Sequence, residues 1–195
     1  MAHRTSAELD ALLDHVLAAP AEQGTVTMVV RRPAEDAREI LGVGRLTVAG
    51  GLEGDDWKHR GSSRTPDGGP HPDMQLNVIS SRVIAALAGT DAERALAGDQ
   101  LHLDLDLTEA NLPAGTRLRV GEAVIEVTDQ PHRGCAKFSA RFGADARRWV
   151  NAGDRGGLRL RGLNARVVHP GEVRPGDRVT KVRAGAPVPG VSARG

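Results

Sequence analysis

The chain contains few of the residues on which several common functions depend. Its 195 residues include a single cysteine, Cys135, two phenylalanines, two tryptophans and no tyrosine. One cysteine excludes an internal disulfide, an iron–sulfur cluster and any metal site with several thiolate ligands from the chain. The scarcity of aromatic side chains removes the stacking platforms on which single-stranded nucleic acids bind.

Charge of one sign and long hydrophobic runs are also missing. Twenty-six basic residues balance 25 acidic ones, so the net charge indicates neither a nucleic-acid nor a membrane partner. Residues 1–20 carry acidic side chains and no long apolar run, so we expect neither a signal peptide nor a membrane span there. We expect a soluble cytoplasmic protein, a monomer or homodimer, that acts on a small molecule.

The motifs of several large enzyme classes are absent. There is no P-loop, no nucleophile elbow and no HExxH sequence. Residues 42–44 (GVG) lack the third glycine of a dinucleotide fingerprint, and no regular βαβ unit surrounds them. The seven histidines are scattered, without the spacing of paired zinc ligands on one helix. Each histidine therefore reads as an ordinary surface or core residue.

Hydrophobic periodicity predicts many short strands and a few helices. A first helix, capped by Thr5 or Ser6, carries an apolar stripe at helical spacing and ends at Pro20. Strands are expected over residues 25–30, 39–48, 75–79, 101–107, 163–169 and 177–182, and a hairpin over 117–120 and 123–127. Further helices are expected over residues 80–88, 92–96, 136–142 and 144–151, and turns at 170–171 and 175–176.

This pattern predicts a mostly β, barrel-like α+β domain. We expect the domain to span residues 21–183, with the helix of residues 1–20 packed on it. Residues 184–195 have the composition of a disordered tail.

Cys135 lies between the predicted strand 123–127 and the predicted helix 136–142. Its thiol would therefore meet the first N–H groups of a helix. Four basic or titratable side chains lie nearby in sequence: His132, Arg133, Lys137 and Arg141. Positive charge and oriented dipoles lower the pKa of a thiol and favour the thiolate, which is both a nucleophile and a metal ligand. The alternative is a small buried residue that fills a gap in the core.

Residues 50–69 form the longest predicted loop, with six glycines, a tryptophan and mixed charges. Loops of this length inside compact domains tend to be functional or disordered. The glycines allow close approach of a ligand, and Lys58 and Arg60 can donate hydrogen bonds to an anion. We expect ligand binding to order this loop. The basic corner at Arg31 and Arg32 is either a solvated turn or a phosphate contact.

Five segments together resemble the MOSC domain, which is named for the C-terminal domain of molybdenum cofactor sulfurase. Residues 51–55 (GLEGD) resemble its GxxGD loop, residues 98–101 (GDQL) its GENL-type segment, and residues 126–138 carry its single motif cysteine. Residues 111–121 match its LxxGxxxxxG pattern and residues 161–177 its closing strand-turn-strand. The segments follow the family's order over residues 25–183. Gln100 replaces the asparagine of the pattern, and Asp56-Trp57 replaces the usual Arg-His after the first loop.

The resemblance implies a stand-alone MOSC protein with a barrel like the pyruvate-kinase β-barrel and a bound molybdenum cofactor (molybdopterin). It also implies that Cys135 is the molybdenum ligand and the catalytic residue, and that the enzyme reduces N-hydroxylated or N-oxide compounds. The phosphate and pterin of the cofactor need cationic forks and hydrogen-bonding groups. Candidate cofactor-binding residues are Lys58, Arg60, Asp99, Gln100, Arg133, Lys137, Arg141 and Arg161.

Two other functions stay open. Cys135 can carry a persulfide for cofactor assembly, supplied by an external sulfur donor, since nothing in the chain resembles a pyridoxal-phosphate domain. The domain can also be a binding module without catalysis. A reductase would need an external electron donor protein, because the chain lacks flavin, nicotinamide, iron–sulfur and haem signatures.

Overall fold

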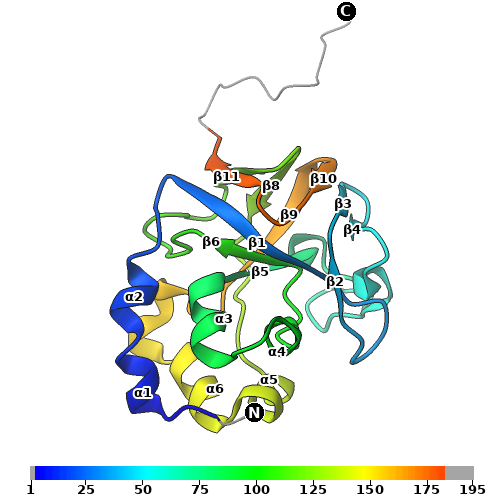
Figure 1. Cartoon of the computed structure of the whole chain (residues 1–195). Helices are drawn as coiled ribbons and strands as arrows, with labels where there is room; N and C mark the ends of the chain where they lie inside the picture. The colour runs from blue at the N-terminus through cyan, green and yellow to red at the C-terminus, as the bar shows by residue number, and fades with distance from the viewer. Residues whose placement is uncertain (1–2, 183–195) are drawn as a thin grey trace, which may run out of the picture.

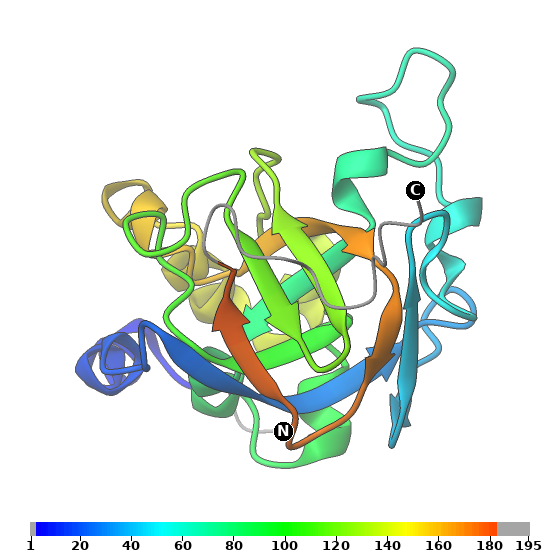
Figure 2. The same ribbon diagram turned by 90° about the horizontal axis from the view of Figure 1, so that it is seen from above.

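The computed structural model describes residues 3–182. Its centre is a closed, mixed barrel of seven strands, seen end-on in Figure 2. In order around the barrel the strands are β1 (Gln23–Arg31), β11 (Arg178–Lys181), β7 (Arg117–Val120), β8 (Ala123–Val127), β9 (Leu163–His169), β5 (Leu76–Ser80) and β6 (Leu101–Asp104). The barrel closes because β1 pairs with both β6 and β11. β5 and β6 run parallel, and the other barrel pairs are antiparallel.

Apolar side chains fill the barrel, as expected for one of this size. Val26, Leu103, Ile125 and Val179 have no exposed surface. β1 contains a register shift between Val26 and Met28. Such a bulge changes which side chains face inward, and it bends the strand. As a result, Val26 packs inside the barrel, whereas Met28 packs outside it.

The short α-helices of residues 3–182 lie at one end of the barrel (Figure 1). They are α1 (Ser6–Asp10), α2 (Leu13–Leu17), α3 (Ser81–Leu87), α4 (Asp91–Ala95), α5 (Ala136–Phe142) and α6 (Ala144–Val150). The apolar faces of α1, α2, α3, α5 and α6 form a second core around Phe142 and Trp149, whereas Ala95 of α4 packs with Met28 and Val30. The Trp149 Nε1–H group also donates to Asp10 Oδ1 at 3.0 Å, which fixes the N-terminal helices on α6. No helix within residues 3–182 has the length and apolar character of a membrane span.

Shorter elements surround the barrel. β2 (Glu39–Leu41) extends the sheet beyond β1, and β10 (Gly171–Val173), β3 (Gly44–Thr47) and β4 (Gly51–Leu52) form a separate three-stranded sheet. Three 3₁₀ helices are η1 (Asp56–His59), η2 (Pro72–Met74) and η3 (Gly153–Leu158). The predicted loop of residues 50–69 therefore begins with ordered structure, since it contains β4 and η1.

The sequence pattern predicted the barrel, the β7–β8 hairpin and α5 correctly. The strand predicted over residues 101–107 is wrong in length, because β6 ends at Asp104. His102, one of the polar residues of this alternating segment, is buried. The turn predicted at residues 170–171 is wrong at Gly171, which begins β10 and pairs with Leu46 of β3.

The starts of two predicted helices also differ in part from the sequence prediction. The first helix is divided into α1 and α2, and Thr5 caps α1 through a capping box with Glu8. Ser80 stands at the start of α3, but its hydroxyl makes no capping hydrogen bond. The predicted tail of residues 184–195 lies outside the described residues.

Gly162 gives a direct test of the junction between β5 and β9. Its φ is +99°, and a Cβ at this position would lie 2.0 Å from the backbone oxygen of Val78. We therefore expect Gly162→Ala to lower the free energy of unfolding by at least about 2 kcal/mol, measured by urea denaturation. Gly42→Ala is the control, because a Cβ there meets nothing within 4 Å. Equal stability of the two variants would show that this junction is not tightly constrained.

Candidate functional site

A cleft of about 540 Å³ lies between the barrel and the helices. Seven cationic side chains line it: Arg32, Arg38, Arg60, Arg133, Lys137, Arg141 and Arg161. Three carboxylates line it as well: Glu35, Asp36 and Asp56. Although the whole chain is nearly neutral, this cleft carries an excess of positive charge, which favours an anionic ligand.

Cys135 lies on the lining of the cleft as the N-cap residue of α5, where the sequence pattern placed it. It is exposed, so it does not fill a gap in the core. Burial is the largest single influence and raises the pKa of the thiol. The backbone N–H groups of Phe138 and Lys137 and the charge of Arg161 together outweigh it, and the pKa is lowered. The thiolate is therefore favoured at this position.

Asn151 holds the segment that precedes Cys135. Its side-chain oxygen accepts a hydrogen bond from the Gly134 N–H at 2.9 Å, and its Nδ2 donates to the Gly134 carbonyl at 2.8 Å. A Cβ at Gly134 would lie 3.1 Å from Val150 Cγ2 and 3.3 Å from the Phe138 ring. Gly134 thus fits tightly between α5 and α6, and Asn151 fixes the backbone next to the thiol.

Arg161 forms part of the floor of the cleft and is buried. Its Nη1 contacts both carboxylate oxygens of Asp99 at 2.8 Å, and its guanidinium carbon lies 4.8 Å from the centre of the Phe138 ring. Asp99 has no exposed surface and does not line the cleft. Its structural partner is Arg161, a residue 62 positions away in the chain.

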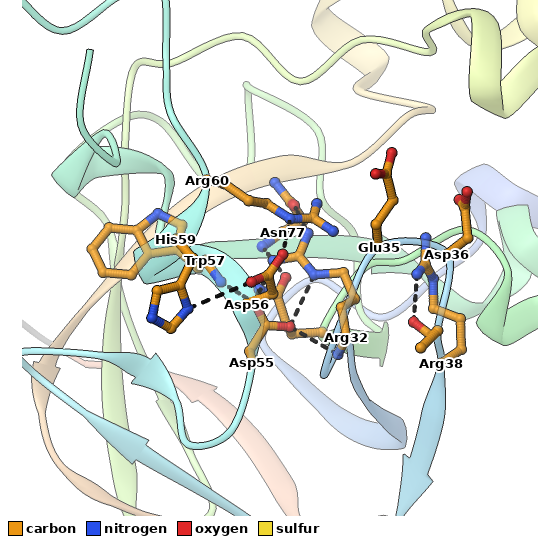
Figure 3. A network of polar contacts seen from close by, with 12 residues as sticks. Arg32, Glu35, Asp36, Arg38, Asp55, Asp56, Trp57, His59, Arg60 and Asn77 are labelled. Atoms are coloured by element: carbon orange, nitrogen blue, oxygen red, sulfur yellow. Dashed lines mark hydrogen bonds and ion pairs between the residues drawn. The ribbon is translucent and has the colours of Figure 1, made fainter.

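A second buried ion pair anchors Arg32 (Figure 3). Arg32 donates to Asp55 from Nε at 2.9 Å and from Nη2 at 2.7 Å, and its Nη1 donates to Asn77 Oδ1 at 3.0 Å. Gln100 supports the same network, since its Oε1 accepts a hydrogen bond from the Asn77 N–H at 2.8 Å. The aspartate of the GLEGD loop therefore fixes an arginine in the cleft wall.

Arg38 is a half-buried cation of the cleft that forms no ion pair within residues 3–182, and its Nη1 donates to the Ala37 carbonyl at 2.5 Å. Its Nε is buried and has no hydrogen-bond partner among the described residues. Burial, followed by the charges of Arg141, Arg32 and Arg60, lowers its pKa to about 10. Four guanidinium groups thus converge here, and an anion between them would relieve their repulsion.

Two acidic residues lie at the mouth of the cleft, on the turn between β1 and β2. Asp36 forms an ion pair with Arg141 at 2.5 Å, and Glu35 forms one with Lys137. All four side chains line the cleft. These carboxylates satisfy the outer cations, whereas Arg38 lies deeper and lacks such a partner.

His132 lies in the cleft wall, three residues before Cys135. Its side chain is one-tenth exposed, and its Nδ1 has no hydrogen-bond partner within residues 3–182. Burial and the charges of Arg161 and Arg32 hold its pKa well below its ordinary value, so the ring is neutral at pH 7. In the sequence, only its position near Cys135 distinguished His132 from the other six histidines.

The structure brings most of the predicted site residues together. Five predicted cofactor-binding residues line the cleft with Cys135: Arg60, Arg133, Lys137, Arg141 and Arg161. Gln100 and Asp99 are completely buried behind it, and Lys58 is exposed and absent from its lining. The ordering of residues 50–69 by a ligand stays a prediction.

Sequence reasoning missed three residues: Arg38, Asn77 and Asn151. Each owes its place to contacts between distant segments, and none belongs to a recognisable motif. The described residues contain no group of three or more His, Cys, Asp or Glu side chains arranged for a metal ion. A metal bound here through Cys135 would need further ligand atoms, and these would have to come from the cofactor that carries the metal.

Comparison with known proteins establishes the family. The model of the MOSC domain matches residues 67–180, which is more than half of the chain. The chain belongs to the MOSC domain family, whose members are generally associated with binding of a molybdenum cofactor. No curated protein sequence matches the chain.

Solved structures show the same fold. The YuaD protein from Bacillus subtilis has a TM-score of 0.55 and 17% identity, over 80% of this chain and 94% of that chain. YiiM from Escherichia coli has a TM-score of 0.51 and 24% identity, over 82% of this chain and 70% of that chain. At these identities the likeness concerns the fold.

The environment of Cys135 can be tested through its reactivity, since it is the single thiol. We expect the pH profile of iodoacetamide alkylation to have a midpoint below that of an unperturbed cysteine, about 8.5, because the thiolate is stabilised. Asn151→Ala should raise the midpoint, because it releases the backbone at Gly134. Asn111→Ala is the control, since Asn111 binds the backbone of Ala21 and Asp106 instead. A midpoint at or above 8.5 in the native protein would contradict the assignment.

Proposed function

We propose that the cleft binds a molybdenum cofactor with Cys135 as the metal's protein ligand, and that the protein reduces N-hydroxylated or N-oxide compounds. The observation that carries the proposal is an exposed thiol of lowered pKa on the lining of a strongly cationic cleft. Membership of the MOSC family supports the class of cofactor.

The residues fit such a group. A thiolate is a soft donor and suits a metal that already carries the two sulfurs of a pterin dithiolene. The phosphate end of the cofactor needs cationic hydrogen-bond donors, and Arg38, Arg60 and Arg32 supply them in one wall of the cleft. The cleft volume of about 540 Å³ lies within the range of small-molecule sites. When bound, molybdenum supplies a centre that accepts and passes on electrons.

The chain itself supplies binding and orientation. Asn151 fixes the backbone at the thiol, and Asp55 and Asp99 hold Arg32 and Arg161 in place. Reduction of an N–OH group to N–H takes two electrons and two protons and releases water. The electrons must come from a separate donor protein, because the chain has no sequence signature of a second redox cofactor.

The exposure and lowered pKa of Cys135 also favour a second function, transfer of sulfur as a persulfide. In that case, a sulfur donor protein would deliver sulfane sulfur to the thiolate, and the outer sulfur would pass to an acceptor. Intact-mass analysis separates the two functions, because a persulfide adds one sulfur atom to Cys135 and leaves no molybdenum.

Substitution of Cys135 tests the metal assignment. Protein made in a cofactor-competent host should contain molybdenum, measured by plasma mass spectrometry, and Cys135→Ser should lose most of it. The serine is nearly isosteric at an exposed position, so the thermal midpoint should stay close to that of the native protein. Ser139→Ala is a matched control on the same helix and should retain the metal. A serine variant with full molybdenum content would disprove the assignment.

The source of electrons can be tested with artificial donors. Cofactor-loaded protein should reduce an N-hydroxylated amidine with reduced viologen as the donor, because viologen can transfer electrons without a dedicated docking site. NADH or NADPH alone should give no turnover. Steady turnover with a pyridine nucleotide and no second protein would reveal a redox site in this chain.

A further inference from the structure

A second cavity, called here the side cavity, lies next to the cleft and has a volume of about 270 Å³. Its lining includes residues 128–133, residues 150–153 and Arg159. His132, Arg133 and Arg161 line both the side cavity and the cleft, so these side chains form the wall between them. The function proposed above assigns no ligand to the side cavity.

Arg159 is the first sign that the side cavity holds a ligand. It adopts the left-handed conformation at φ +48°, which is unfavourable for a residue other than glycine. Its Nη1 donates to the Leu112 carbonyl at 2.6 Å, but no carboxylate of the described residues pairs with it. Burial lowers its pKa, and the charge of Glu109 opposes this only in part. Glu109 lines the same cavity, but it forms no ion pair with Arg159, so this half-buried guanidinium favours binding of an anion.

The glycines of η3 are the second observation that points to a ligand in the side cavity. Gly153 and Gly156 line the side cavity, and a Cβ at either position would meet no atom within 4 Å. Neither has a positive φ, so neither the packing nor the backbone conformation of the chain requires glycine there. Bare backbone at the lining of a cavity permits close approach of a ligand.

The wall of the side cavity contains the third sign. The Nε of Arg161 is buried and has no hydrogen-bond partner within the described part of the chain, whereas the Nδ1 of His132 lies 3.6 Å from Asp99 Oδ1. Buried polar groups usually have partners, and those without one often mark a binding site. Both side chains belong to the wall that the two cavities share.

We propose that the side cavity is a second anion-binding subsite, which takes a phosphate or carboxylate group held by Arg159 against the bare backbone at Gly153 and Gly156. The anion belongs either to an extension of the molecule in the cleft or to a separate small molecule such as the substrate. The subsite does not depend on which cofactor fills the cleft.

Calorimetric titration with inorganic pyrophosphate at low ionic strength tests the subsite. Cofactor-free protein should bind pyrophosphate at two sites, one in the cleft and one in the side cavity. Gly156→Ala should weaken one site by at least about tenfold, because its methyl group blocks close approach to the backbone. Gly157→Ala is the matched control, since a Cβ there also meets nothing within 4 Å but Gly157 is absent from the lining.

Two arginine variants show which pyrophosphate site lies in the cleft and which lies in the side cavity. Arg159→Gln should weaken the site that Gly156→Ala weakens, and Arg38→Gln should weaken the other. Thermal midpoints should confirm that the variants fold. If only the Arg38-dependent site is lost, the cleft does not bind pyrophosphate as expected. The assignment of the other site to the side cavity is then unchanged. Pyrophosphate binding that is insensitive to both Gly156→Ala and Arg159→Gln would overturn the proposal.

Cofactor-loaded protein distinguishes the two sources of the anion. If the cofactor extends into the side cavity, loaded protein loses the site that Gly156→Ala weakens. If the site belongs to a separate molecule, loaded protein keeps it. Either result supports an anion subsite, because in both cases Gly156→Ala changes binding and Gly157→Ala does not.

Discussion

The buried ion pair between Arg161 and Asp99 is the interaction on which the candidate site depends. Asp99 is completely buried, and Arg161 is its charged partner. Removing one member of such a pair leaves an uncompensated buried charge and costs about 3–5 kcal/mol. The same guanidinium packs on the Phe138 ring and helps to lower the pKa of the Cys135 thiol. Fold stability and thiol reactivity are therefore coupled through one side chain.

The carboxylates around the cleft neutralise some of its cations and leave others unpaired. Asp55 and Asp99 lie behind the lining and each neutralises one arginine. Arg38 has no such partner, and the acids at the mouth pair with Lys137 and Arg141. The carboxylates neutralise cations behind the lining and at the mouth, and they leave the charge of Arg38 inside the cleft unpaired. Such a cleft suits an anionic ligand.

Sequence alone predicted the elements whose signals are local. The β7–β8 hairpin follows from period-two alternation around Gly121, and α5 follows from the break at Pro131 and Gly134. It did not predict β10, because that strand forms only by pairing with β3, more than a hundred residues earlier.

The candidate site was predictable to a similar extent. Cys135 and its basic neighbours were identified because the helix start and the family motif are both local. Asp99 was expected to face a ligand, whereas its position is decided by Arg161, which lies far along the chain. Asn151 and Arg38 carry no motif, and only the folded structure brings Arg38 to the cleft and Asn151 to the backbone at Gly134.

Anomalous diffraction at the molybdenum absorption edge tests the central claim most directly. Crystals of protein made in a cofactor-competent host should give an anomalous peak in the cleft, within bonding distance of the Cys135 sulfur. A molybdenum peak elsewhere in the molecule, or a cleft without one in protein that contains the metal, would contradict the account.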